Sequence, residues 1–399
     1  MNVLWLVSWY PNKTSPFNGD FIQRHARAVS ARCPVTVIHV VKDQQGLASR
    51  ETETVVSPDG ALTEKVSYLS APRTPFAFLN RAGFQVKAFR LYARAIREYV
   101  SVHGRPRFIH VHVCMNAGIV ALWAKYRWRI PYLVTEHFSV YIPESENSYR
   151  YRPFLYRFVN KRILAGASGV HNVSRFLQGC EEAITPLARP VIIPNAVDTE
   201  IFRPTDAVGP AGPFRFIHIS SFDPLKNVTG LLEAFAILSR QRTDWELTLV
   251  GAAGEELRAF AQGDAQWTAL EGRLRWAGTL SYREVGSLLR QADALVLFSL
   301  FENQPCVISE ALCCGLPVIS SNVGGIAEEV TPDRGILVPR GDRVALALAL
   351  NRLMQEYDRF GRRRIAASAS ERYGYNNVGR LFMEYYAAVF RDAAPGASR

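Results

Sequence analysis

The hydrophobic positions in the first half of the chain form short apolar runs separated by stretches with helical spacing. We interpret the apolar runs as buried strands, at Val3–Ser8, Val35–Val41, Phe108–Val113, Tyr132–Thr135, Gly169–Asn172 and Val191–Ile193. The helical stretches between them are Phe21–Arg32, Ala82–His103, Ala117–Arg127 and Tyr149–Ala165. Strands that alternate with helices form a parallel sheet covered on both faces. The pattern therefore predicts a Rossmann-like α/β domain.

The second half of the chain repeats this alternation. Strands are predicted at Phe214–Ser220, Glu246–Val250, Leu274–Ala277, Ala294–Phe298, Pro317–Ser320 and Gly335–Val338. Helices are predicted at Val228–Arg240, Tyr282–Gln291, Pro305–Cys314, Ile326–Val330 and Arg343–Glu356. Between the halves, the segment 194–213 contains four prolines and two glycines and is the best candidate for a linker. We expect two Rossmann-like domains with parallel sheets facing a central cleft, with ligands at the carboxyl ends of the strands.

Two carboxylates stand eight positions apart around a predicted helix start. A buried strand ends at Phe298, and a polar turn leads to a helix that begins near Pro305, a residue suited to the first helical turn. Glu302 would precede this helix and Glu310 would lie inside it, and both could accept hydrogen bonds from vicinal hydroxyls of a sugar or ribose. The backbone amides at residues 303–306 would be unpaired donors, which suit an anion or a hydroxyl. Spacing alone also permits a simple helix cap at Glu302 and an ordinary surface pair at Glu310.

Three other positions at strand ends could take part in a ligand site. Lys226 precedes the predicted helix Val228–Arg240, where its compact charge could meet a diphosphate. Gly19 lies in a strand-to-helix turn and allows a phosphate to approach the backbone closely. His137 follows the strand Tyr132–Thr135. The alternatives are a solvated lysine, a simple turn glycine and a structural histidine.

A metal site is not predicted. His110 and His112 share one face of a strand, but no third ligand is evident from the sequence. No Asp-x-Asp motif occurs, so the usual metal clamp for a nucleotide diphosphate is missing. The six cysteines are scattered without a Cys-x-x-Cys pair, and we expect them to be reduced.

The positive charge is concentrated in the first half of the chain. Residues 1–198 contain 25 Lys/Arg against 13 Asp/Glu, whereas the remaining residues contain 22 against 23. One basic stretch, Arg73–Arg107, has aromatic residues between its eight basic residues, and a second runs from Lys125 to Arg162. This asymmetry indicates an anionic membrane surface, nucleic acid or an acidic substrate, unless it is only a solvated surface. We expect no nucleic acid, because no recognisable nucleic-acid motif is present.

No apolar stretch reaches the roughly 18 residues of a membrane-spanning helix, and the N-terminus reads as a buried strand rather than a signal peptide. The expected location is therefore cytoplasmic, with possible peripheral contact at the inner face of the cell membrane. The basic, aromatic-bearing surface of the first domain favours a glycan or lipid-linked acceptor close to that membrane.

The segment around Glu302 and Glu310 resembles the family 4 glycosyltransferases. That family carries Glu, seven residues, Glu, followed by Ala, Gly and Pro-Val-Ile; here Ala311, Gly315 and Pro317-Val318-Ile319 follow, with Gly324-Gly325 beyond them. The resemblance covers nearly the full chain and is strongest from 214 to 340. It implies a GT-B fold and a retaining, metal-independent hexosyltransferase that needs no cofactor besides its nucleotide diphosphate sugar. The implied pathway is synthesis of cell-surface polysaccharide or lipopolysaccharide. A GT-B-like sugar-nucleotide epimerase and a non-catalytic nucleotide-sugar or glycan-binding protein are the alternatives.

The resemblance also implies roles for residues and domains. Residues 1–198 would bind the acceptor, 199–375 would bind the donor, and a C-terminal helix within 376–399 would cross back to the first domain. Near the reacting carbon, His137 would contact the donor sugar, Lys226 the diphosphate and Glu302 the sugar hydroxyls. The other implied donor-binding residues are Gly19, Gly251, Leu280, Asn303, Gln304, Pro305, Cys306 and Glu310, the last of which would bind the ribose. The chain departs from the family at Ser221, where an arginine usually stands, so charge neutralisation of the diphosphate would be weaker or would be supplied elsewhere.

Overall fold

The computed structural model describes residues 2–43, 52–70, 75–143, 148–205, 212–251, 270 and 272–390. The chain divides into two compact units, Met1–Ala196 with Tyr375–Arg399, and Val197–Gly374. The first segment of the first unit therefore ends at Ala196, whereas the sequence analysis expected the first domain to end at residue 198. The predicted linker is only partly a linker, because Val197 and Phe202 are fully buried in the core of the second unit. Residues 206–211 of that segment lie outside the described residues.

The first unit contains an eight-stranded sheet in the order β3-β4-β2-β1-β5-β6-β7-β8. Its strands are β1 (Val3–Val7), β2 (Val35–Asp43), β3 (Thr52–Val56), β4 (Leu62–Ser70), β5 (Ile109–His112), β6 (Tyr132–Glu136), β7 (Gly169–Asn172) and β8 (Val191–Ile192). All are parallel except β3, which pairs antiparallel with β4 at one edge. The sequence pattern predicted six of these strands and missed β3 and β4.

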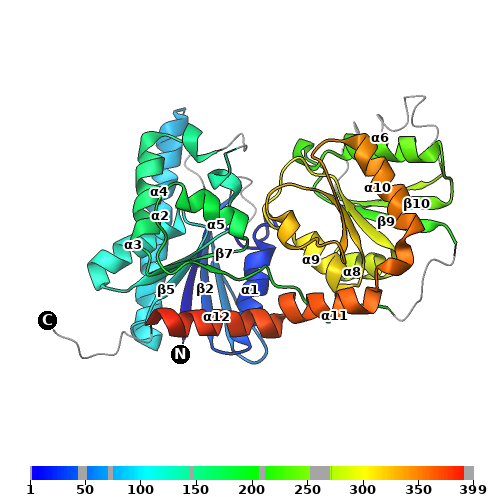
Figure 1. The fold of residues 1–399 in the computed structure, drawn as a ribbon. Helices are drawn as coiled ribbons and strands as arrows, with labels where there is room; N and C mark the ends of the chain where they lie inside the picture. The colour runs from blue at the N-terminus through cyan, green and yellow to red at the C-terminus, as the bar shows by residue number, and fades with distance from the viewer. Residues whose placement is uncertain are drawn as a thin grey trace. The chain divides into compact units, whose positions relative to one another are not determined.

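Helices cover both faces of this sheet. They are α1 (Asp20–Ser30), α2 (Ala77–His103), α3 (Ala117–Trp128), α4 (Phe154–Gly166), α5 (Arg175–Glu182) and α12 (Tyr375–Phe390). Helices α1 and α12 pack together on one face, while α2, α3 and α4 form a layer on the other (Figure 1). The predicted helix Tyr149–Ala165 is interrupted: a short 3-10 turn, Tyr149–Tyr151, precedes Pro153, and α4 begins only after that proline.

The C-terminal helix α12 is part of the core of the first unit. Its side chains Val378, Phe382 and Tyr386 are buried in the same cluster as Trp5 of β1 and Ile22 of α1. The backbones of α1 and α12 approach each other closely at Gly379. A Cβ atom added there would overlap the carbonyl oxygen of Ala28. The helix thus docks through a position that only glycine can fill.

Gly379→Ala should destabilise the first unit by roughly 1–3 kcal/mol, because the added methyl group forces α12 away from α1. In a unit of this size, that corresponds to a fall of about 2–12 °C in melting temperature. The matched control is Gly179→Ala in α5, where an added Cβ meets no atom within 4 Å and should stabilise the helix slightly. Thermal unfolding of both variants tests this, and a Gly379→Ala protein that melts like wild type would contradict the packing described.

The second unit contains a six-stranded parallel sheet in the order β11-β10-β9-β12-β13-β14. Its strands are β9 (Phe214–Ile219), β10 (Trp245–Val250), β11 (Leu274–Gly278), β12 (Ala294–Leu297), β13 (Val318–Ser321) and β14 (Gly335–Val338). Its helices are α6 (Val228–Ser239), α8 (Tyr282–Gln291), α9 (Cys306–Cys313), α10 (Arg343–Gln355) and α11 (Arg362–Tyr373). Helices α6 and α10 pack together on one face, and α9 and α11 pack together on the other (Figure 1).

Both sheets contain a point at which the strand order reverses. In the second unit, β9 leads to β10 on one side, whereas the neighbouring β12 leads to β13 on the other. In the first unit, β1 leads to β2 and its neighbour β5 leads to β6 in the opposite direction. The loops at the carboxyl ends of such neighbours diverge and leave a crevice where ligands bind. The fold class predicted from the sequence, α/β with Rossmann-like parallel sheets, is confirmed. Among the described residues, no helix combines the length and the apolar character needed to cross a membrane.

Candidate functional site

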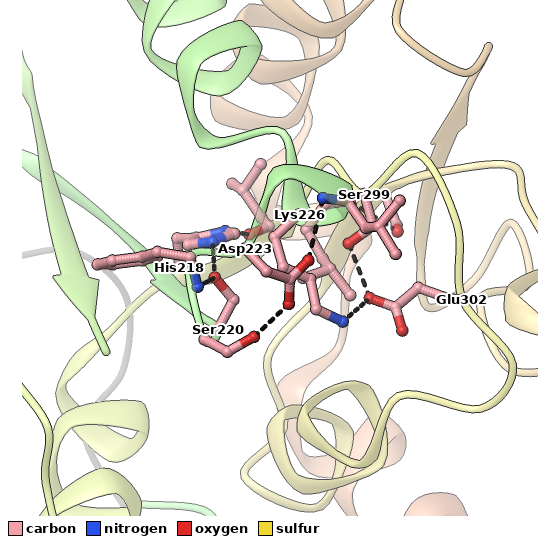
Figure 2. Close-up of polar contacts among 12 residues, drawn as sticks. His218, Ser220, Asp223, Lys226, Ser299 and Glu302 are labelled. Atoms are coloured by element: carbon pink, nitrogen blue, oxygen red, sulfur yellow. Dashed lines mark hydrogen bonds and ion pairs between the residues drawn. The ribbon is translucent and has the colours of Figure 1, made fainter. Parts of the chain in front are cut away.

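The strand order places the expected crevice of the second unit at the loops that follow β9 and β12. The amide of Leu300 in the second loop donates a hydrogen bond to the carbonyl oxygen of Leu225 in the first, at 2.7 Å. Across the same junction, the Lys226 ammonium donates to Oε1 of Glu302 at 2.7 Å. The hydroxyl of Ser299 donates to that same oxygen, also at 2.7 Å (Figure 2). The structure thus brings Lys226 and Glu302, 76 positions apart, into direct contact.

This ion pair is largely shielded from solvent. The side chains of Lys226 and Glu302 are 23% and 9% exposed. Among the described residues, no hydrogen bond occupies the second carboxylate oxygen of Glu302, so that oxygen can accept from a ligand. Lys226 carries three N–H donors, of which Glu302 takes one. The pair therefore offers both an acceptor for hydroxyls and a donor for an anion.

The loop after β9 is held by a buried histidine. The Nδ1 of His218 contacts the carbonyl oxygen of Val296 at 2.9 Å, and Nε2 contacts the hydroxyl of Ser220 at 2.8 Å. Burial lowers the pKa of His218 to about 4, so the ring is neutral near pH 7. Its Nδ1–H then donates to Val296 and Nε2 accepts from Ser220, whose oxygen accepts from the Phe222 amide at 3.2 Å. Through these bonds, shown in part in Figure 2, the loop is fixed to both central strands.

Ser221, at the position where the family usually has arginine, stabilises the loop itself. Its hydroxyl donates to Oδ2 of Asp223 at 2.5 Å, while Oδ1 of Asp223 accepts from the amide of Leu225 at 3.0 Å. Asp223 in this way caps the short 3-10 turn Pro224–Lys226 that presents the lysine. Ser221 brings no positive charge, so Lys226 is the cation that this loop offers to an anion.

The loop after β12 leads into α9, which begins at Cys306, one residue later than predicted; Pro305 is its N-cap. The side chain of Gln304 turns into the protein, where Nε2 donates to Oε1 of the buried Glu329 at 3.0 Å. The hydroxyl of Ser309 donates to the same oxygen at 3.0 Å. Gln304 therefore anchors the loop with its side chain.

The remaining donor-binding predictions fall at different places in the second unit. Glu310 lies on α9 and is almost completely buried. Gly251 follows β10 with a φ of 145°, and a Cβ atom there would overlap the carbonyl oxygen of Ser220, so this glycine allows close contact with the β9 loop. Leu280 packs against the core of the unit. The amide of Gly325 donates to the carbonyl of Asn303 at 3.0 Å and helps to fix the loop backbone.

Gly19 and His137 both belong to the first unit, where their loops are neighbours. Gly19 precedes α1 in the left-handed conformation, with a φ of 67°, and a Cβ atom there would lie 2.7 Å from the backbone carbon of Trp9. The ring of Phe21 lies 4.6 Å from that of His137, and Trp9 lies 5.0 Å from Phe138. The loops after β1 and β6 therefore pack against each other.

Glu136, which the sequence analysis did not select, positions His137. Its Oε1 accepts from the amides of His137 and Phe138 at 2.8 and 2.9 Å, and its Oε2 accepts from the amide of Cys114 at 2.9 Å. Burial raises the pKa of Glu136, although these hydrogen bonds favour the carboxylate. In the sequence, the signal for Glu136 was its place beside His137 at the end of a buried strand, in Thr135-Glu136-His137.

Three buried imidazoles approach one another beside this loop. Ring nitrogens of His25, His112 and His137 lie within 4.8 Å of each other, and burial lowers the pKa of all three, that of His25 to about 3. His110 is not part of this group, because its nitrogens contact Tyr386 and Thr135 at 2.6 Å each. The two histidines that lie close to His112 are thus His25 of α1 and His137 of the loop after β6, and not His110 of the same strand. Neutral imidazoles can bind a transition metal, so metal independence stays a prediction.

Comparison with known proteins gives two adjacent family matches. The description "Glycosyl transferase 4-like domain" matches residues 19–196, and "Glycosyl transferases group 1" matches residues 205–372. The chain is 26% identical over 313 residues to a D-inositol 3-phosphate glycosyltransferase of Paenarthrobacter aurescens, covering 74% of this chain and 75% of the relative. It is 28% identical over 205 residues to the lipopolysaccharide 1,6-galactosyltransferase of Escherichia coli, covering 50% and 56%.

Solved structures with a similar fold include Anabaena HepE in complex with UDP-glucose. The TM-score is 0.68 at 20% identity, and the match covers 97% of this chain and 100% of HepE. At this identity the likeness concerns the fold, and it extends over both units.

Proposed function

Because the chain belongs to the family 4 glycosyltransferases with the GT-B fold, we propose that it transfers a hexose from a nucleotide diphosphate sugar with retention of anomeric configuration. The proposed acceptor is a glycan or a lipid-linked sugar in the synthesis of cell-surface polysaccharide or lipopolysaccharide. The Escherichia coli relative, a lipopolysaccharide galactosyltransferase, supports this class of acceptor. The complex of HepE with UDP-glucose supports the class of donor.

The observation that carries this proposal is the Lys226–Glu302 pair in the crevice of the second unit. A nucleotide diphosphate sugar carries both kinds of group that the pair can bind. Its phosphate oxygens would accept from Lys226, and the sugar hydroxyls would donate to Glu302. As the bond to the sugar breaks, negative charge grows on the leaving diphosphate, and a cation already held in place stabilises it. No comparable charge comes from Ser221, so the lysine carries more of this work than in the usual family pattern.

The other contacts of the donor are proposed from the resemblance to the family. Glu310 would bind the ribose hydroxyls, backbone amides at Asn303 and Cys306 would meet the sugar, and Gly251 and Leu280 would border the phosphate and the base. The roles of Gly19 and His137 toward the donor stay predictions from the resemblance. We propose that the donor phosphate itself, and not a dedicated base of the protein, takes part in removing the proton of the acceptor hydroxyl.

Thermal unfolding in the presence of nucleotide diphosphates and their sugars tests the donor class. A ligand present at 100 times its dissociation constant should add about 2.7 kcal/mol of stability, which is a shift of several degrees. Transfer is then measured by mass spectrometry with the stabilising donor, and the anomeric configuration of the product by NMR. Chelation with EDTA should leave transfer unchanged.

Two results would count against the proposal. If no nucleotide diphosphate stabilises the protein, the donor site is wrong. If the donor sugar changes configuration when no acceptor is present, the protein is an epimerase. A stabilising donor that is neither transferred nor altered indicates a binding protein.

A further inference from the structure

Helix α4 and the turn before it expose an unusual set of large apolar side chains. Tyr151, Phe154, Leu155 and Phe158 are 65%, 75%, 69% and 48% exposed, and we refer to these four residues as the aromatic ridge. The rings of Phe154 and Phe158 stack, with centroids 6.2 Å apart. Only the opposite side of the helix is buried, through Asn160, Ile163 and Leu164. Leaving this much apolar surface in water is unfavourable, so the ridge is suited to a partner.

Basic side chains surround the aromatic ridge. They are Arg150, Arg152, Arg157, Lys161 and Arg162. Two of them lie over rings of the ridge: Arg150 is 4.6 Å from the ring centroid of Tyr151, and Arg162 is 5.3 Å from that of Phe158. None of the five forms an ion pair with a carboxylate of the described residues, and the segment 148–180 contains no Asp or Glu. These five side chains therefore carry positive charge that no carboxylate of the described residues neutralises, and this charge is available to an anionic partner.

The ridge lies at the functional edge of the first unit. Helix α4 follows β6 and precedes the parallel strand β7, so its N-terminal end lies near the carboxyl ends of the strands. The loops that carry Gly19 and His137 leave the sheet at that same edge. Figure 1 shows α4 in the outer helix layer with α2 and α3. A surface that the ridge docks on would thus adjoin the edge of the sheet where ligands are expected.

The first basic stretch found in the sequence, Arg73–Arg107, also exposes large apolar side chains, but these are spread along the whole length of the stretch: Phe76, Leu79, Val86 and Val102. Within α2, Tyr92 is buried, and Phe89 packs against Trp123 with ring centroids 5.3 Å apart. The aromatic residues that alternate with basic residues there serve partly to hold the helix layer together. Among the described residues, α4 and the turn before it differ in density, because four exposed large apolar side chains, three of them aromatic, lie there within eight positions.

We propose that the aromatic ridge inserts into the headgroup region of an anionic lipid bilayer, with the five basic side chains binding the lipid phosphates around it. Aromatic side chains favour the membrane interface, and a basic rim is attracted to anionic headgroups. This inference rests on the proposed function, because it brings the ligand-binding edge of the first unit to the surface where a lipid-linked acceptor resides. The charge asymmetry of the sequence did not locate the contact with the membrane. The exposed side chains of α4 indicate both its place and its mode, which is insertion of apolar side chains together with binding of charged headgroups.

The test is sedimentation of the full chain with vesicles, without donor or acceptor. One set contains phosphatidylcholine alone and the other includes about one-third phosphatidylglycerol. Phe154→Ser/Leu155→Ser/Phe158→Ser should weaken binding to anionic vesicles at least about tenfold. Arg157→Gln/Lys161→Gln/Arg162→Gln should weaken it by about fivefold per charge at low salt, and less at high salt. The matched control is Val344→Ser/Leu348→Ser on α10, where the two apolar side chains are 54% and 60% exposed; it should bind like wild type.

Circular dichroism of each variant confirms that the fold is kept, which is expected because every substituted side chain is exposed. The proposal is overturned if wild type ignores anionic vesicles at low salt, or if the ridge variant binds as well as wild type. A ridge variant that binds like wild type would mean that the protein adsorbs to the vesicles through charge alone, without insertion. If the wild-type protein glycosylates a water-soluble acceptor but does not bind vesicles, the membrane proposal is wrong and the proposed function stands. A protein that binds vesicles through the ridge but transfers no sugar would remove the proposed function alone.

Discussion

Lys226→Ala and Glu302→Ala should each abolish detectable glycosyl transfer, with a loss of at least about 10²–10³-fold in kcat. Lys226 is the cation presented by the β9 loop, and without it the charge on the leaving diphosphate loses its main stabilising partner. Glu302 would hold the hydroxyls of the sugar, so its removal misplaces the reacting carbon. Steady-state transfer with the donor identified by thermal unfolding measures both effects.

A second ion pair in the same unit supplies the control. Arg343 and Glu233 form an ion pair at 2.7 Å on α10 and α6, outside the crevice. Arg343→Ala removes an exposed pair of similar length and should leave transfer unchanged. Each single variant in the crevice leaves a shielded partner without its counter-charge, so a modest fall in melting temperature is also expected. The double variant should lose less stability than the sum of the two single variants. Wild-type turnover in either single variant would show that the site is elsewhere.

Gly324→Ala should lower transfer about 100-fold although no ligand-binding side chain is removed. Gly324 has a φ of 56°, and a Cβ atom there would overlap the carbonyl oxygen of Glu302. The Glu302 loop must shift to make room, which separates its carboxylate from Lys226. Transfer rates and affinity for the nucleotide diphosphate alone should both be measured. The affinity should fall less than the rate, since the sugar contact is affected first.

The matched control for this variant is Gly341→Ala. Gly341 has a similar φ of 71°, but the nearest atom to an added Cβ is Cδ2 of Leu300, at 3.9 Å. Both variants carry the same left-handed strain, roughly 1–2 kcal/mol, and only Gly324→Ala adds the overlap. Equal loss of transfer in the two variants would assign the effect to strain and not to the position of Glu302.

The strands that are buried on both faces could be predicted from the sequence almost to the residue. Strands β1 and β12 are apolar runs between turn signals, and each was predicted to within one residue of its observed end. Strands β3 and β4, at one end of the first sheet, were missed because they are only partly buried. In β3 most side chains are exposed, and β4 buries only some of its positions, so neither presents an apolar run.

The candidate site shows a similar limit. The sequence could place Lys226 and Glu302 at two strand ends, since each follows a buried strand. It could not show that they meet, because that depends on β9 and β12 being neighbours in the sheet. It also could not show that Gln304 turns inward to Glu329, or that the hydroxyl of Ser221 is engaged with Asp223. Such details depend on the folded arrangement of side chains, which the local sequence pattern does not reveal.

The second unit is continuous in sequence, and its two ends meet. Val197 pairs with Gly374 in an isolated bridge, and the amide of Val197 donates to the carbonyl of Tyr373 at 2.9 Å. Residues 197–374 are therefore a cassette inserted into the first unit, whose last helix is synthesised only after the cassette is complete. On the ribosome, the second unit can fold before the first unit is finished. For engineering, the same arrangement favours exchange of this cassette between relatives, with both junctions cut at one place in the structure.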